Sequence, residues 1–93
     1  MDDAELDEIE RRFRAASPGP WTSFVEGRDH LAGDDFIRVS DEDAEPDMYV
    51  SRAVDGGPVA ASSADLDFIA AARQDIPRLV AALRQMRAEQ GDP

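Results

Sequence analysis

Cysteine, lysine and asparagine are absent from this sequence, and histidine occurs once, as His30. Without cysteine the chain can form neither a disulfide nor a thiolate metal site, so its fold has to rest on packing. No apolar run reaches the length of about eighteen residues that a membrane-spanning helix needs. The first residues are acidic, unlike the basic start of a secretion signal. We therefore expect a cytoplasmic protein that needs neither a cofactor nor a metal.

Among the charged residues of the sequence, acidic residues outnumber basic ones. Twenty-one carboxylates face ten basic groups, all of them arginine, and the formal net charge is −11. This charge disfavours direct binding to DNA or RNA, because the nucleic-acid phosphates are also negative. It allows a partner protein with a basic surface. Abundant Ala, Arg, Gly, Pro and Asp without Lys or Asn indicate a GC-rich coding bias and fit an actinobacterial source. A salt-adapted source would also give an Asp-rich surface without lysine.

The length of 93 residues predicts a single domain, 1–93. A chain of this size buries only about 60–65% of the surface that its unfolded form exposes, which leaves room for one core but not for a deep substrate cavity. The apolar fraction of 42% is ordinary for a globular protein and argues against wholesale disorder.

The N-terminal segment is predicted to be an amphipathic helix. Leu6, Ile9 and Phe13 recur at helical spacing on one side. Asp2 and Glu5 have the spacing of a capping box. The segment 17–20 contains two prolines and ends the helix, because proline donates no backbone hydrogen bond.

Three short strands are predicted next, over residues 21–26, 36–40 and 48–54, where aromatic and β-branched residues concentrate. The polar connections 27–33 and 41–47 are long enough for antiparallel hairpins. The turn residues 55–58 are expected to end the third strand.

The last third is predicted to be helical. Ser62 and Ser63 can cap a helix whose apolar side carries Leu66 and Ile69. Pro77 predicts a break or a sharp kink near Asp75. Beyond it, five residues form one apolar helical stripe: Ile76, Leu79, Val80, Leu83 and Met86.

These elements predict an α+β fold in the order α-β-β-β-α-α. We expect a small three-stranded antiparallel sheet, with the N-terminal helix and a C-terminal helical pair or kinked helix on one face. The open sheet edge then offers a surface through which a homodimer could form.

Two motifs carry a resemblance. The turn Ala-Ser-Pro-Gly-Pro-Trp at 16–21 and the helical segment Asp-Phe-Ile-Ala-Ala-Ala-Arg-Gln-Asp-Ile-Pro-Arg-Leu at 67–79 resemble a group of short uncharacterised actinobacterial and actinophage proteins. More distantly they are similar to early-region proteins of lambdoid phages. The resemblance covers both ends of the chain and leaves the acidic middle unmatched. It implies a shared fold and a phage or mobile-element origin, but no activity.

Trp21 follows directly on the rigid turn of the first motif. The interpretation that we favour is a core residue packed against Phe13 and the C-terminal helix, because an indole ring fills much of a small core. The alternative is an interface anchor, since tryptophan is enriched among binding hot spots.

The acids concentrate in the middle of the chain. Residues 29–47 hold eight carboxylates against one arginine, a local balance of −7. The simpler interpretation is that these acids form a solvated loop region that aids solubility. The alternative interpretation is that this segment binds a partner, with five acids as candidate contacts: Asp41, Glu42, Asp43, Glu45 and Asp47.

Catalytic and metal-binding patterns are weak. His30 with Asp29, Asp34 and Asp35 could seat a divalent cation or act in acid–base chemistry, but a polar loop explains the same residues better. The run from residue 41 resembles a calcium loop and fails, because Pro46 occupies its sixth position and Arg52 its twelfth.

The sequence therefore favours a non-enzymatic interaction module that recognises another protein. The alternative hypothesis is a DNA mimic, in which the acids of 29–47 present phosphate-like charge to a basic nucleic-acid-binding protein. No phosphate-binding loop, nucleophile elbow or zinc motif supports an enzyme.

Overall fold

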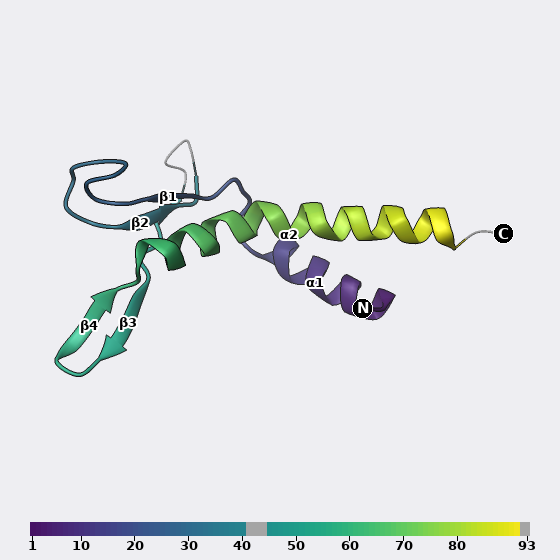
Figure 1. Cartoon of the computed structure of the whole chain (residues 1–93), viewed down its shortest axis with the longest axis horizontal. Helices are drawn as coiled ribbons and strands as arrows, with labels where there is room; N and C mark the ends of the chain where they lie inside the picture. The colour runs from purple at the N-terminus through teal and green to yellow at the C-terminus, as the bar shows by residue number, and fades with distance from the viewer. Residues whose placement is uncertain (41–44, 92–93) are drawn as a thin grey trace.

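The computed structural model describes residues 1–40 and 45–91. Its elements are helix α1 (Asp3–Ala15), strands β1 (Thr22–Phe24), β2 (Phe36–Arg38), β3 (Ser51–Val54) and β4 (Gly57–Ala60), and helix α2 (Ser63–Gln90). The expected α+β class is confirmed. Helix α2 is the axis of the molecule: β1 and β2 lie against its N-terminal half, and α1 lies along the rest (Figure 1).

Helix α1 begins where the capping signal predicts. The Asp2 carboxylate accepts a hydrogen bond from the Glu5 N–H at 2.8 Å, and the Glu5 carboxylate accepts one from the Asp2 N–H at 3.2 Å. This reciprocal pair satisfies amide groups that the first turn of a helix leaves free. On the side facing α2, Leu6 is fully buried, while Ile9 and Phe13 are half-buried.

The predicted three-stranded sheet is wrong, because the strands form two separate two-stranded sheets. β1 pairs antiparallel with β2, and β3 pairs antiparallel with β4. Met48 reaches β2 only through a single bridge to Ile37, with two backbone hydrogen bonds of 2.8 Å. The following residues pair instead with 57–60 in a local hairpin, so the expected third strand leaves the first sheet.

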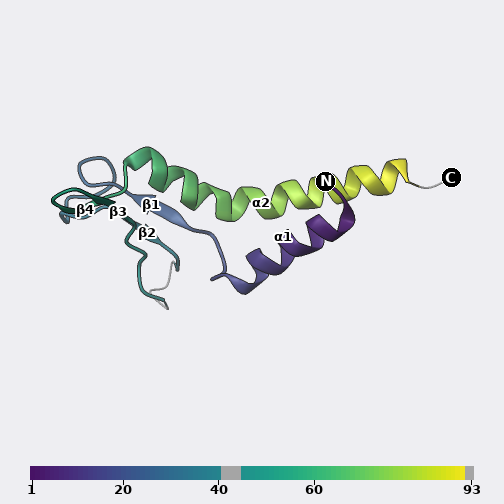
Figure 2. The same cartoon turned by 90° about the horizontal axis from the view of Figure 1, so that it is seen from below.

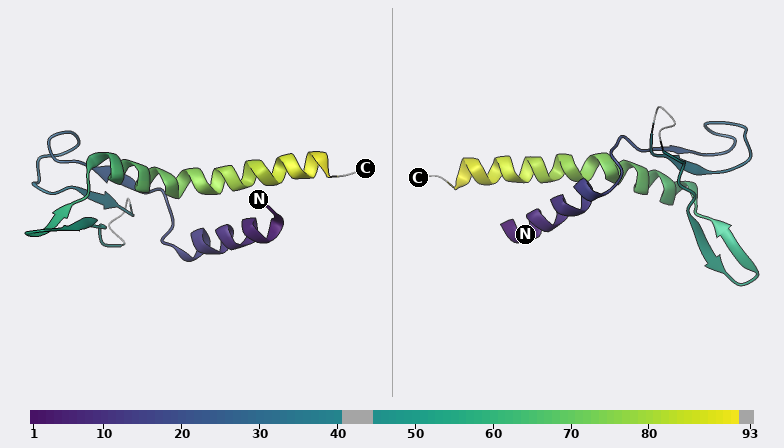
Figure 3. Two further views of the ribbon diagram at one scale, coloured as in Figure 1. Left: turned by 60° about the horizontal axis from the view of Figure 1, so that its bottom comes forward. Right: turned by 180° about the vertical axis from the view of Figure 1, so that it is seen from behind.

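The β3–β4 hairpin projects from the body of the molecule (Figures 1 and 3). Asp55 and Gly56 connect its strands, and Gly56 has φ 96°, a left-handed conformation that glycine adopts at little steric cost. Every residue of both strands is exposed. The hairpin is therefore held mainly by its own ladder.

Helix α2 runs without interruption for 28 residues, so the predicted break near Asp75 is wrong. The Ser62 hydroxyl caps it by accepting a hydrogen bond from the Asp65 N–H at 3.1 Å. Pro77 lies inside the helix and cannot donate to the carbonyl one turn earlier. The β1–β2 sheet packs on the N-terminal half of the helix and α1 along the remainder (Figure 2). This tertiary packing outweighs the local cost of the proline.

The core is small and lies between the β1–β2 sheet and the N-terminal half of α2. Its buried residues are Ile37, Val39, Ala61, Leu66 and Ala70, with Trp21, Val50 and Ile69 packed around them. The molecule measures 58 × 34 × 22 Å and has a radius of gyration of 16.9 Å. A compact chain of this length would have a radius of gyration of about 12 Å. Within 1–40 and 45–91, no helix has the length and apolarity to cross a membrane.

Candidate interaction surface

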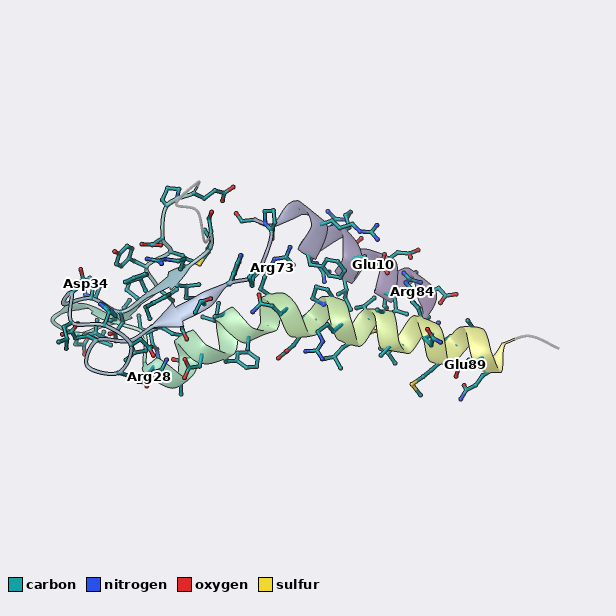
Figure 4. The ribbon with its side chains drawn as sticks, turned by 90° about the horizontal axis from the view of Figure 1, so that it is seen from above. Glu10, Arg28, Asp34, Arg73, Arg84 and Glu89 are labelled. Carbon is teal, nitrogen blue, oxygen red and sulfur yellow. The ribbon has the colours of Figure 1, made fainter. Side chains whose placement is uncertain are left out.

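Helix α1 and the C-terminal half of α2 lie side by side and run antiparallel (Figures 1 and 3). Arginines of α2 tie the pair together: Arg84 contacts Asp7 at 2.7 Å and also Glu10, and Arg87 contacts Asp3. Figure 4 shows Arg84 directed at the helix that carries Glu10. The hydrogen bonds to Glu10 and Asp7 raise the pKa of Arg84. These contacts set the register of the two helices, although exposed ion pairs each contribute only about 0–1 kcal/mol.

An apolar groove runs between the two helices. It has a volume of about 460 Å³ and is lined by Met1, Ile9, Arg12, Ile76, Leu79, Val80 and Leu83. Only Val80 among the lining residues of α2 is buried, with 5% of its surface exposed. The sole polar side chain in the lining is that of Arg12, so the groove offers apolar contact rather than catalytic groups. We refer to it as the open groove.

Exposed apolar side chains continue along one side of α2. Four of them form what we name the α2 stripe: Ile76, Leu79, Leu83 and Met86. They are spaced three, four and three residues apart, which places them on one side of a helix. Their exposed fractions are 39%, 58%, 39% and 54%. The sequence predicted one apolar stripe that contains these four residues and Val80, and of the five the structure buries only Val80.

Trp21 packs at the edge of the core and is half-buried, less than the sequence predicts. Its backbone N–H donates to Gln74 Oε1 at 2.8 Å, and Gln74 Nε2 donates to its carbonyl at 3.0 Å. The indole N–H donates to the Ser17 carbonyl at 3.2 Å, which also accepts from Arg73 Nε at 2.8 Å. These hydrogen bonds connect the turn before Trp21 to α2. They support a packing role for Trp21.

The five acids named as candidate partner contacts are not brought together as one described surface. Asp41, Glu42 and Asp43 lie outside the described residues. The Glu45 carboxylate accepts a hydrogen bond from the Ser17 hydroxyl at 2.9 Å. Asp47 lies 3.9 Å from Arg38 Nε. The two described candidates therefore make contacts within the chain.

Other acids of the segment 29–47 hold the loop between β1 and β2. Asp29 accepts a hydrogen bond from the Val25 N–H, and Asp35 accepts one from the Glu26 N–H, both at 2.8 Å. Asp34 is exposed, and Figure 4 places it at the end of the molecule away from α1. Carboxylates engaged with backbone amides have a local structural role that needs no partner.

Arg28 connects this loop to α2. Its guanidinium donates to both carboxylate oxygens of Asp67 at 2.9 Å, and its Nε donates to Asp29 at 3.0 Å. Asp67 also accepts from the Ser23 hydroxyl at 2.5 Å. The hydrogen bonds from Arg28 and then Ser23 lower the pKa of Asp67 to about 2. Three segments of the chain meet in this network, namely β1, the loop that follows it and α2, but its groups are matched to one another and leave no catalytic pair.

His30 belongs to an aromatic cluster. Its ring lies 5.2 Å from that of Phe36 and 6.3 Å from that of Phe24, and the two phenylalanine rings stack at 5.3 Å. His30 Nδ1 accepts a hydrogen bond from the Ala32 N–H at 3.0 Å. Within the described part of the chain, no three His, Asp or Glu side chains are grouped so that they could hold a metal ion.

Comparison of the chain with family models, with curated proteins and with solved structures gives no match. The resemblance to actinobacterial and phage proteins therefore stays a hypothesis. Sequence reasoning missed the open groove, including the parts played by Met1, Ile9 and Arg12. The signal for it was the apolar stripe of α2, which is wider than a single neighbouring helix can cover.

Proposed function

We propose that this chain is a non-enzymatic interaction module that recognises another protein chain through the open groove and the α2 stripe. The supporting observation is the amount of apolar surface left uncovered there. Met1 and the four members of the stripe, weighted by their exposed fractions, leave on the order of 500 Å² of apolar surface. The largest apolar patch on a monomeric protein is typically about 300–600 Å² and is often a functional surface. The spacing of the stripe suits a helix as the docking element.

The DNA-mimic hypothesis has less support. A mimic has to present free carboxylates to a basic protein, as a phosphate backbone does. Asp29, Asp35 and Glu45 instead accept hydrogen bonds from backbone or side-chain donors of the same chain. We therefore favour the apolar surface over the acidic segment as the site of recognition.

Photo-crosslinking in the source cells tests the proposal. A benzophenone amino acid is placed at Ala82, which shares a surface with Leu79. The matched control places it at Ala81, which is also exposed and points about 100° further round the helix. We expect a protein adduct from position 82 and little from position 81. Equal adducts from both positions, or none from position 82, would contradict the proposal.

A further inference from the structure

We infer that the occupant of the open groove and the α2 stripe is a second copy of this chain, so that two helical pairs form a four-helix bundle. The inference rests on the proposed function, because it names the partner of the same surface. Three features of the surface support a second copy as its occupant: the symmetry of the stripe, the distribution of charge and the area available for burial.

The α2 stripe is suited to pairing with itself. Its spacing of three, four and three residues is that of a coiled-coil seam. When two such stripes meet antiparallel about a two-fold axis, Leu79 faces the partner's Leu83 and Ile76 faces the partner's Met86. Every member then has an apolar counterpart, and the symmetric closure leaves no member uncovered. Ala82 lies beside the midpoint of the seam, close to the axis.

Charge favours pairing through this end of the molecule. Residues 17–62 hold ten carboxylates against three arginines, whereas residues 63–93 hold five against four. Residues 1–16, which include α1, hold six carboxylates against three arginines, so the helical end carries a net −4 against −7 for residues 17–62. A four-helix bundle therefore brings the less charged part of two acidic chains together. At the rims of the apolar surface, Arg12, Asp75 and Arg78 have no ion-pair partner among the described residues.

The area also fits. A stable interface buries about 800 Å² on each partner, with an apolar centre and a polar rim. The apolar patch supplies on the order of 500 Å² of this, and the arginines and carboxylates at its rims supply the remainder. In the single chain, α1 and α2 form one layer with an open side, whereas helical domains bury such a side against a second layer. Dimerisation would provide that layer.

The test uses the purified full chain. Sedimentation equilibrium should report twice the chain mass of 10.2 kDa for the parent. Leu79→Glu should shift the mass to that of one chain with the helical circular dichroism retained. Val59→Glu is the matched control: it places the same charge on an exposed apolar residue of the hairpin and should stay dimeric. Added salt should strengthen the dimer, because the two acidic chains repel each other less.

Since the chain lacks cysteine, a single introduced cysteine tests the geometry. The two copies of Ala82→Cys, which flank the seam too far apart for a direct disulfide, should be joined by a bismaleimide that spans about 10 Å, and Ala81→Cys should be joined far less. A parent that stays monomeric up to about 100 μM, where dimers of micromolar affinity form readily, overturns the inference. If this monomer still gives a crosslink from position 82 to a different protein in cells, the proposed function stands and only the second copy is wrong. A dimer lost in Val59→Glu but kept in Leu79→Glu also overturns it.

Discussion

The two halves of α2 have similar apolar content and very different surroundings. In the N-terminal half, Leu66 and Ala70 are buried at 1% and 3% exposure against the β1–β2 sheet and the segment before the helix. In the C-terminal half only Val80 is buried, and the α2 stripe is exposed. A sheet covers a broad face of a helix, whereas α1 covers one stripe. An apolar helical stripe therefore shows which side of a helix is suited to burial, but not which part of the protein covers it.

Alanine substitutions should lower the free energy of unfolding far more in the N-terminal half of α2 than in the C-terminal half. Leu66→Ala should lower the free energy of unfolding by about 2–5 kcal/mol, because it empties space in the core. Leu79→Ala makes the same chemical change at a residue that is 58% exposed. In dilute solution, where the chain is monomeric, it should cost less than about 1 kcal/mol. Urea unfolding at low protein concentration measures both. Equal losses would show that the two halves are equally packed.

A second effect concerns the bond between the turn and the middle of α2. Gln74→Ala removes the side chain that pairs with both backbone groups of Trp21. Leaving those half-buried groups unpaired should cost about 1–3 kcal/mol. Gln85→Ala is the control, because Gln85 is exposed and its side chain donates to Glu89, one turn along the same helix. Similar melting temperatures for the two variants would mean that the turn is not fastened through Gln74.

The pH dependence of stability tests the network at the N-terminal end of α2. Hydrogen bonds from Arg28 and then Ser23 lower the pKa of Asp67 from 3.8 to about 2. The folded state therefore favours the charged carboxylate. Its contribution is present above about pH 4 and is lost as the pH falls through about 2. Because Asp67 is 46% exposed, the effect should be modest.

Acid unfolding of Asp67→Asn should therefore show a shallower loss of stability between pH 4 and 2 than the parent. Asp65→Asn removes a carboxylate from the same turn without touching Arg28 and is the matched control. A parent slope that Asp67→Asn leaves unchanged would show that Arg28 and Asp67 do not pair in solution.

The smallest expected effect comes from the acidic segment. Changing Asp34, Asp41, Glu42 and Asp43 to Asn, Gln or Ser should leave stability unchanged or slightly higher, because repulsion among surface charges is screened at ordinary salt within about 8–10 Å. Dimerisation should be unaffected or slightly tighter. Loss of binding to a basic protein in this variant, with DNA competing for the same protein in the parent, would instead support the DNA mimic.

Local signals predicted the helical elements best. The capping box of Asp2 and Glu5 and the stripe from Leu6 predicted α1, because both act within a few residues. The break near Pro77 was wrong because packing on both sides of the proline outweighs its local cost. Strand β4 was missed because Gly57 and Pro58 argue against a strand, although proline is tolerated in an edge strand. The turn signal of Asp55 and Gly56 was the available clue.

The candidate surface could be predicted only in part. The spacing from Ile76 to Met86 showed an apolar side of the helix, and this side exists. Its exposure depends on how far the sheet extends along α2, which no local pattern encodes. The acidic segment was visible as a charge run, but the bonds of Asp29 and Asp35 to backbone amides depend on the path of the loop.

Hydrogen exchange along α2 at two protein concentrations reports whether a second copy covers the C-terminal half of the helix. Residues 63–75 pack one face on the β1–β2 sheet within each chain, through Leu66 and Ala70, so their protection should not change with concentration. Residues 76–90 should gain protection as concentration rises, since a second copy then covers the open groove and the α2 stripe. Leu79→Glu should remove this gain and leave the first half unchanged. Protection of residues 76–90 that is independent of concentration, and equal in the parent and in Leu79→Glu, would contradict the account.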